Sequence, residues 1–317
     1  MMRRMRIASL EPFITALVVS FGRGEDLVGV SRGCGLPAEM GAVLRLTRAR
    51  PPAPGPVVSA KVYRLESAAC SELLDPKALR VANPDIILTR VPAEKEIVPL
   101  ALANIREDVN ALLEREAAVI SFNPYTLEEV FAAYEELGRS IETADKGIDL
   151  ARRQKAQFMD WGDNFYDRMK NKRVTVISSL NPLMLAGFWV PDMIKICSAV
   201  SQAAVGKEDQ PVSWREVVQF RPDVIICAPR GASLTDAARS FTWFEKQPDW
   251  DTVPAAKRGE VFFAAGGRYF YQPGHGLIES MGILVSAIAG LDSGYITPRD
   301  SFYRLRWLEL QRHRFGP

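Results

Sequence analysis

The chain contains one short pattern twice, at positions far apart in the sequence. Residues 81–90 read VANPDIILTR and residues 219–230 read QFRPDVIICAPR, so Pro-Asp is followed each time by a mainly β-branched apolar run and an arginine. The residue before a proline is pushed out of the α region, so the pattern predicts a helix that ends before Pro84 or Pro222 and then a strand. Near-continuous apolar runs are typical of parallel strands covered on both faces. Two copies, 222 − 84 = 138 residues apart, predict an α/β fold with two equivalent Rossmann-like lobes.

Size and charge agree with a duplicated globular fold. At 317 residues the chain exceeds the usual single domain, and 47% hydrophobic with 25% charged residues is an ordinary globular composition. A formal net charge of +2, spread along the chain, provides no basic stripe, so we expect no nucleic-acid partner. No run of about 18 uninterrupted apolar residues occurs, so we expect no transmembrane segment.

The N-terminal segment has some features of an export signal, since MMRRMR is followed by the apolar run IASLEPFITALVVSFG. Glu11 and Pro12 interrupt that run, and no small-residue cleavage site follows in VVSFGRGED. We therefore interpret RIASL as a buried strand that leads into a helix beginning near Pro12. On this basis we expect a cytoplasmic protein, with a periplasmic location as the alternative.

The order of predicted elements divides the chain into four segments. Strands and helices alternate in the first and third segments, whereas no strand candidate occurs between Thr126 and Lys170, where Thr126 and Glu129 form a capping-box pattern and a long helix is expected near 143–169. Further helices are expected from Ser59 to about Leu74 and in the tail. The predicted segments are an N-terminal α/β lobe (1–122), a connecting helical segment (123–171), a C-terminal α/β lobe (172–291) and a helical tail (292–317) with Phe302, Leu305, Leu308 and Leu310 on one face.

Motifs for several kinds of chemistry are absent from the sequence. There is no G-x-x-x-x-G-K-[ST], no G-x-G-x-x-G after a strand and no G-x-S-x-G, and neither His275 nor His313 has metal-ligand spacing. The cysteines form no C-x-x-C pair and are interpreted as small buried residues; they are Cys34, Cys70, Cys197 and Cys227. We therefore predict a non-catalytic protein without a metal site of its own.

The remaining candidates lie in loops that follow strands, where open α/β sheets bind ligands. The aromatic and glycine-rich loops of the second lobe offer flat apolar surface and close backbone approach, and Arg230 adds a charged donor, which suits a large, flat, partly polar ligand. The predicted ligand-binding residues of the first lobe are Leu10, Glu11, Pro12, Ser31, Arg32, Cys34 and Arg90. Those of the second lobe are Trp189, Arg230, Tyr269, Phe270, Tyr271 and His275.

Over residues 5–291 the chain resembles the helical-backbone (class III) substrate-binding proteins for cobalamin and ferric siderophores. The resemblance rests on LVGVSRGCGLP, the paired PDIILT and PDVIICAP, LMLAGFWVPDM, and YFYQPGHGL, in that order, and it is closest to the cobalamin-binding branch. It implies two lobes joined by a long helix, with the ligand in a cleft between them. We therefore expect a monomer that binds a corrinoid as ligand and has no covalent cofactor.

The resemblance also implies a docking surface on each lobe, where a glutamate pairs with arginines of an ABC permease. Those glutamates would stand seven residues before the repeated prolines, at the positions of Lys77 and Arg215. Basic residues there would repel permease arginines. The nearest acids are Asp75 and Glu216, so the resemblance predicts a relative that keeps the binding fold and is uncoupled from the transporter.

Other functions remain open from the sequence. A ferric siderophore, haem or another tetrapyrrole is the alternative ligand for an ABC-importer protein. An enzyme or chelatase-like protein on the same scaffold would use Cys34, His275 or Glu11. An interaction module with a closed cleft is the third alternative.

Overall fold

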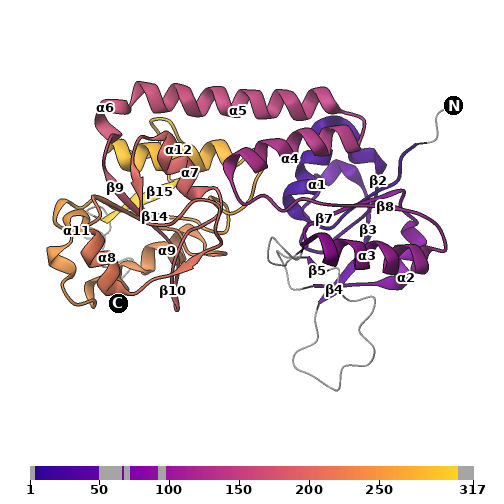
Figure 1. The fold of residues 1–317 in the computed structure, drawn as a ribbon, viewed down its shortest axis with the longest axis horizontal. Helices are drawn as coiled ribbons and strands as arrows, with labels where there is room; N and C mark the ends of the chain where they lie inside the picture. Colours follow the sequence, from indigo (N-terminus) through magenta and orange to yellow (C-terminus); the bar gives the residue numbers. More distant parts are fainter. Residues whose placement is uncertain (1–3, 50–65, 68–71, 92–97, 306–317) are drawn as a thin grey trace, which may run out of the picture. The chain divides into compact units, whose positions relative to one another are not determined.

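The computed structural model describes residues 4–49, 66–67, 72–91 and 98–305. The chain forms two compact units, shown in Figure 1. Unit 1 comprises the residues up to Asn123 together with Glu135–Ile148, and unit 2 comprises Pro124–Tyr134 and the residues from Asp149 onward. Both are α/β units, as the doubled pattern predicts.

Unit 1 is built on a parallel sheet with the strand order β3-β2-β1-β7-β8. The chain runs from β1 to β2 and β3 on one side of β1, and β7 and β8 follow on the other side. Because right-handed crossovers run in both directions along the sheet, helices lie on both of its faces. The strands are β1 (Ile7–Ser9), β2 (Leu27–Val30), β3 (Leu44–Arg45), β7 (Ile86–Thr89) and β8 (Ala118–Ser121). The helices are α1 (Pro12–Val18), continued by a π-helical turn (Val19–Arg23), α2 (Pro76–Ala82) and α3 (Val98–Leu113).

The apolar run near the N-terminus is part of this core. β1 lies in the middle of the sheet, between β2 and β7, and Ile7 and Ala8 are fully buried. Ile14 and Leu17 of α1 are buried as well. The run therefore forms a central strand and the helix that begins at Pro12, as predicted.

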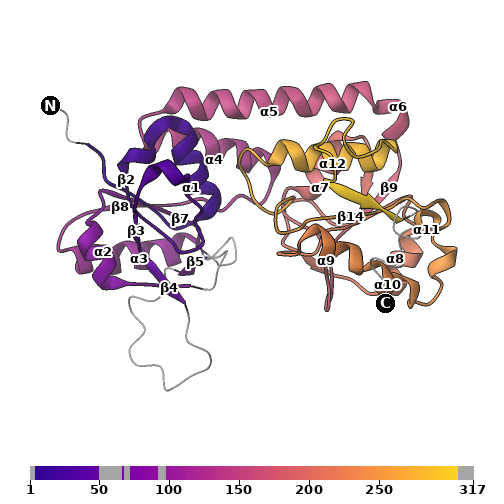
Figure 2. The same cartoon turned by 180° about the vertical axis from the view of Figure 1, so that it is seen from behind.

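Unit 2 is built on a mixed sheet with the order β12-β10-β9-β13-β14-β15, in which β9, β13 and β14 are parallel and β11 also pairs with β9. Helix α12 contacts β13. Figures 1 and 2 show α12 from opposite sides. The strands are β9 (Arg173–Leu180), β10 (Leu183–Leu185), β11 (Val200–Ser201), β12 (Gln210–Pro211), β13 (Val224–Cys227), β14 (Val261–Ala264) and β15 (Phe302–Arg304). The helices are α6 (Tyr166–Met169), α7 (Val190–Ile196), α8 (Trp214–Phe220), α9 (Leu234–Arg239), α10 (Phe241–Glu245), α11 (Pro254–Arg258) and α12 (Leu277–Ala289).

Two further helices, α4 (Leu127–Ser140) and α5 (Ala144–Asn164), occupy the segment without strands. The predicted capping box is confirmed, because the Glu129 amide donates to Thr126 Oγ1 (3.2 Å) and the Thr126 amide donates to Glu129 Oε2 (3.1 Å). The long helix expected near 143–169 is divided, since α5 ends at Asn164 and α6 follows.

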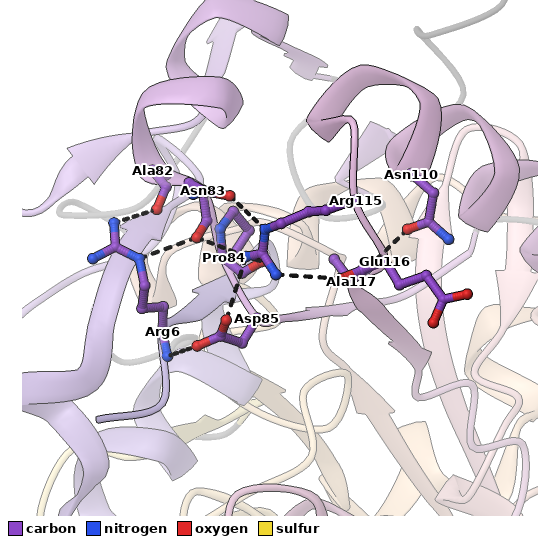
Figure 3. Close-up of polar contacts among 9 residues, drawn as sticks. All are labelled: Arg6, Ala82, Asn83, Pro84, Asp85, Asn110, Arg115, Glu116 and Ala117. Carbon is purple, nitrogen blue, oxygen red and sulfur yellow. Dashed lines mark hydrogen bonds and ion pairs between the residues drawn. The ribbon is translucent and has the colours of Figure 1, made fainter. Parts of the chain in front are cut away.

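The doubled Pro-Asp pattern has the same structure in both units. α2 and α8 end in left-handed residues, Asn83 and Arg221, and the buried strands β7 and β13 follow. In unit 1, Asp85 Oδ2 accepts the amide of Arg6 (2.9 Å), as Figure 3 shows. The Asp85 amide donates back to the Arg6 carbonyl (2.8 Å).

In unit 2, Asp223 makes the same two bonds with Arg173, at 2.9 and 2.8 Å. A distant arginine also contacts each carboxylate, Arg115 at 3.3 Å from Asp85 and Arg258 at 2.7 Å from Asp223. The aspartate of each copy therefore joins the start of its own strand to the start of the sheet's first strand, which explains why the pattern recurs.

Two predicted helices are strands where the structure describes them. Residues 66–67 and 72–74, expected in the helix from Ser59 to about Leu74, form β5 (Glu66–Ser67) and β6 (Glu72–Leu74). β6 pairs antiparallel with β5 on one side and with β4 (Thr47–Ala49) on the other. Residues 302–304 of the predicted tail helix pair antiparallel with β14, and the rings of Phe302 and Phe262 lie 5.5 Å apart. For residues 302–304, hydrogen bonding to the edge of β14 thus outweighs the helical spacing of their apolar side chains. Leu308 and Leu310 lie outside the described residues.

Candidate ligand site at the strand ends

In unit 1, the carboxyl ends of β1 and β2 carry a buried polar cluster. Thr15 Oγ1 lies 2.8 Å from Ser9 Oγ and 3.0 Å from Cys34 Sγ, and Ser31 Oγ lies 3.0 Å from the same sulfur. Arg45 Nη1 donates to the carbonyls of Ser31 (3.0 Å) and Cys34 (2.8 Å), which fixes the loop after β2. The loops at this edge are therefore held by their own side chains.

The predicted unit 1 residues differ in exposure. Leu10, Glu11, Ser31 and Cys34 are buried, Pro12 and Arg90 are half-buried, and Arg32 is exposed. Burial raises the pKa of the Cys34 thiol, although bonds from Ser31 and Thr15 act in the opposite direction. A thiol with a raised pKa is mostly protonated at neutral pH and is a poor nucleophile.

In unit 2, Arg230 is the centre of a cluster of flat groups. Its guanidinium carbon lies 3.9 Å from the ring centroid of Tyr271 and 5.5 Å from that of Phe188, both within cation–π range. Its Nε and Nη2 donate to Asp209 at 2.6 and 2.8 Å, a bidentate ion pair. Four side chains from separate loops thus meet; we call them the Arg230 platform: Phe188, Asp209, Arg230 and Tyr271.

Partial burial strengthens this ion pair. Burial alone would raise the pKa of Asp209, but the hydrogen bonds and charge of Arg230 outweigh it and leave the carboxyl pKa lowered. Burial likewise acts to lower the pKa of Arg230, but Asp209 raises it. Both groups are charged at neutral pH, and the pair carries no net charge.

Close backbone packing positions the rings of the platform. A Cβ on Gly187 would lie 2.2 Å from the carbonyl oxygen of Glu208, so only glycine allows the loop before Phe188 to approach this segment. Phe188 follows with a positive φ of 53° and donates its amide to the Lys207 carbonyl at 2.5 Å. Tyr271 Oη donates to the Ala228 carbonyl at 2.6 Å, which holds its ring beneath Arg230.

The loop after Tyr271 is attached to the parts of α4 and α5 that belong to unit 2. Tyr134 Oη of α4 accepts the amide of Gly274 (2.6 Å) and lies 3.3 Å from its carbonyl oxygen, to which Gln154 Nε2 of α5 also donates (2.9 Å). All three residues are buried, and burial raises the pKa of the Tyr134 hydroxyl. These bonds hold the segment that carries Tyr271.

Tyr134→Phe should destabilise unit 2 by about 1–3 kcal/mol, because the amide of Gly274 would lose its buried acceptor. Denaturant unfolding followed by tryptophan fluorescence measures this effect. Tyr166→Phe is the matched control, since Tyr166 is about half exposed; equal stability of the two variants would contradict the role given to Tyr134.

The structure brings together two of the predicted unit 2 residues, Arg230 and Tyr271. Trp189, Tyr269 and Phe270 are buried, and His275 is exposed. The Trp189 indole Nε1 has no hydrogen-bond partner within the described part of the chain. Desolvation of the imidazole by neighbouring atoms, together with the charge of Arg153, lowers the pKa of His275.

Sequence reasoning missed Phe188 and Asp209. Phe188 directly precedes the predicted Trp189 in AGFW, so its place beside a predicted aromatic residue was a usable signal. Asp209 stands in GKEDQP, which no motif marks; only the fold places it beside Arg230.

The two positions where docking glutamates would be expected are equivalent in the structure. Lys77 and Arg215 are each the second residue of their helix, α2 or α8, and both are exposed. The neighbouring acids are engaged in helix capping: Asp75 Oδ1 accepts the Lys77 amide (2.9 Å), and Glu216 Oε2 accepts the Ser213 amide (2.7 Å).

The described residues contain neither a metal-ligand cluster nor a membrane-spanning helix. No group of three or more His, Cys, Asp or Glu side chains is placed to hold a metal ion there. Within the same ranges, no helix combines the length and apolarity needed to cross a membrane. Cys34, Cys197 and Cys227 are free and buried, and Cys70 lies outside the described residues.

In sequence, the chain matches no protein-family model and no curated protein. In structure, it is similar to a possible iron-binding, periplasmic solute-binding protein from Staphylococcus epidermidis, with 20% identity, a TM-score of 0.65, and coverage of 90% of this chain and 99% of that one. The periplasmic vitamin B12 binding protein BtuF of Vibrio cholerae has 16% identity, a TM-score of 0.61 and coverage of 89% and 96%. A periplasmic heme-binding protein from Pseudomonas aeruginosa has 16% identity, a TM-score of 0.64 and coverage of 95% and 97%. The chain therefore has the fold of the helical-backbone (class III) substrate-binding proteins.

Proposed function

We propose that the protein is a non-catalytic binding protein for a flat metal chelate, with a corrinoid as its ligand. The Arg230 platform is the observation that carries this proposal. Arg230, with 40% of its side chain exposed, and the half-buried Phe188 offer an accessible flat surface. Tyr271 and Asp209 support that surface, so little rotamer entropy remains to be lost on binding.

The charge of the platform favours a corrinoid over haem. Asp209 neutralises Arg230, and the other arginine of these loops, Arg268, is paired with Glu279 at 3.0 Å. Glu208 lies beside the platform, with Tyr125 Oη 3.5 Å from its carboxylate. A ligand with carboxylates on its rim would meet acidic groups here, whereas a corrinoid rim of neutral amides would not. The similarity in fold to the B12-binding protein of Vibrio cholerae agrees with this choice.

A haem or another iron chelate is the second candidate ligand, because solved structures with the same fold include heme-binding and possible iron-binding proteins. An enzyme that uses Cys34 is the less favoured function, since this thiol is buried and its pKa is raised.

Titration with cyanocobalamin tests the function. We expect heat on mixing and a shift of the corrin absorbance, with a dissociation constant in the micromolar range or tighter. Absence of both signals at about 100 μM would exclude the corrinoid, and the same titration with haemin and a ferric siderophore would then test the second candidate.

We further propose that the exposed Lys77 and Arg215 prevent docking on a cobalamin permease. Lys77→Glu combined with Arg215→Glu should create measurable association with such an importer, because acids would then face its arginines. Surface plasmon resonance against the importer measures this. Lys146→Glu with Arg239→Glu, which makes the same charge change at other exposed positions, should have no effect. Equal binding by both double variants would contradict the docking proposal.

The cellular location is tested separately. The structural neighbours from Staphylococcus epidermidis and Pseudomonas aeruginosa are described as periplasmic, which favours the periplasmic alternative over the cytoplasmic expectation. Fractionation of cells that express the chain decides between them. We expect a monomer, which light scattering would verify.

A further inference from the structure

Unit 2 contains a pocket of about 770 Å³ away from the strand ends, between α4, α5 and α7. None of the Arg230 platform residues lines it. Its volume lies in the range of small-molecule sites, about 300–1,000 Å³. The residues that line it include Leu127, Phe131, Phe158, Met159, Gly162 and Ile196.

Two contacts between helices keep the pocket in place. Asp192 Oδ2 of α7 accepts the amide of Leu127, the first residue of α4 (2.9 Å). α5 crosses α7 at Gly162, where a Cβ would lie only 2.9 Å from the carbonyl oxygen of Ile196. The three helices are thus joined at the edges of the pocket, and the space between them is not filled by side chains.

The floor of the pocket is apolar. Phe131 and Phe158 are 3% and 1% exposed, and their ring centroids lie 6.2 Å apart. Met159 is 56% exposed, which is unusual for so large an apolar side chain, and it lines the same space. An apolar floor with an exposed thioether favours an occupant that has an apolar body.

Three of the charged side chains of the lining, Glu128, Lys155 and Asp192, already have a polar partner. Lys155 Nζ lies 3.0 Å from Glu128 and 5.0 Å from the Phe131 centroid, and Asp192 accepts the Leu127 amide. Lys195 and Asp163 are different, since neither makes an ion pair or a side-chain hydrogen bond with any residue that the structure describes.

These two charges come from the same end of the pocket. Lys195 precedes Ile196 and Asp163 follows Gly162, so both flank the crossing of α5 and α7. The pocket therefore combines one available cation and one available anion with an apolar floor.

We propose that this pocket is a second binding site, which takes a short apolar peptide with free termini. The apolar side chains of the peptide pack on Phe131, Phe158 and Met159, its carboxylate lies near Lys195, and its ammonium group lies near Asp163. A peptide with one charge of each sign gives Lys195 and Asp163 a partner each, whereas Asp192 stays at the N-terminal end of α4, where the helix dipole favours an anion.

Calorimetric titration with leucyl-phenylalanine tests the proposal. We expect binding with a dissociation constant below about 1 mM. Met159→Glu should abolish it by placing a charge at the apolar wall. Ile148→Glu is the matched control, because Ile148 is an exposed apolar residue (49%) of the same helix outside the pocket, and it should bind as the wild type does.

The charges are tested with the acetylated, amidated form of the same dipeptide and with Lys195→Gln and Asp163→Asn. Each substitution should weaken binding about two- to five-fold, as expected for partly exposed ion pairs, and the capped dipeptide should bind more weakly still. Four results would overturn the proposal: no heat with leucyl-phenylalanine, unchanged binding by Met159→Glu, unchanged binding by both charge variants, or equal affinity for the capped form. Arg230→Ala should leave dipeptide binding unchanged, so failure of this site and failure of the corrinoid site are distinguishable.

Discussion

Gly266→Ala should unfold unit 2 at a markedly lower denaturant concentration, with a loss of at least about 3 kcal/mol. A Cβ at this position would lie 2.0 Å from the carbonyl oxygen of Pro229 and 2.5 Å from that of Ala228. Both neighbours are backbone atoms, so no rotamer change relieves the clash. Because the Ala228 carbonyl also accepts the Tyr271 hydroxyl, ligand binding should fall together with stability.

Gly276→Ala is the matched control for this prediction. Gly276 belongs to the same glycine-rich segment, has a φ of −66°, and has no atom within 4 Å of an added Cβ. Chemical denaturation of the two variants side by side separates the effect of the close approach from a general effect of losing glycine. Similar midpoints for Gly266→Ala and the wild type would show that the loops after β13 and β14 do not meet as described.

Arg230→Ala should weaken cyanocobalamin binding by about 30-fold, which corresponds to the roughly 2 kcal/mol typical of a residue that dominates an interface. The substitution removes the exposed cationic plane and leaves Asp209 without its bidentate partner. Phe188→Ala should weaken binding as well, without exposing an unpaired charge. Calorimetry with cyanocobalamin measures both effects.

Arg239→Ala is the corresponding control. Arg239 is also a unit 2 arginine in an ion pair, with Asp236 at 3.3 Å, but 65% of its side chain is exposed and it lies outside the platform. Its removal should change the affinity less than two-fold. If Arg230→Ala and Phe188→Ala both bind cyanocobalamin as tightly as the wild type, the platform is not the ligand site.

Local patterns in the sequence predicted most of the fold. The proline that ends α2 or α8 and the apolar run that follows are local signals, and they predicted β7 and β13 correctly. The hydrogen bonds that the amides of Arg6 and Arg173 donate to the carboxylates of Asp85 and Asp223 were not predictable, because they join residues 79 and 50 positions apart. The tail helix was predicted wrongly at residues 302–304 for a similar reason, since pairing with β14 is a non-local effect that helical spacing does not report.

The candidate site was predictable only in part. Arg230 and Tyr271 were found because loops after strands bind ligands in open sheets. Burial of Phe270 and Trp189 was not predictable from composition, because aromatic residues serve both cores and sites. Asp209 and Tyr134 were missed because their partners, Arg230 and Gly274, are distant in the sequence and no motif marks either pair.

The most direct test of the central claim is a pair of calorimetric titrations of the wild-type protein, one with cyanocobalamin and one with haemin, in the same buffer. Because Asp209 neutralises Arg230 and Glu208 lies beside it, the carboxylates of haemin would meet acidic groups at the platform. We therefore expect cyanocobalamin to bind at least about ten-fold more tightly than haemin, a difference of roughly 1.4 kcal/mol. Tighter binding of haemin, or no heat with cyanocobalamin at about 100 μM, would contradict the account.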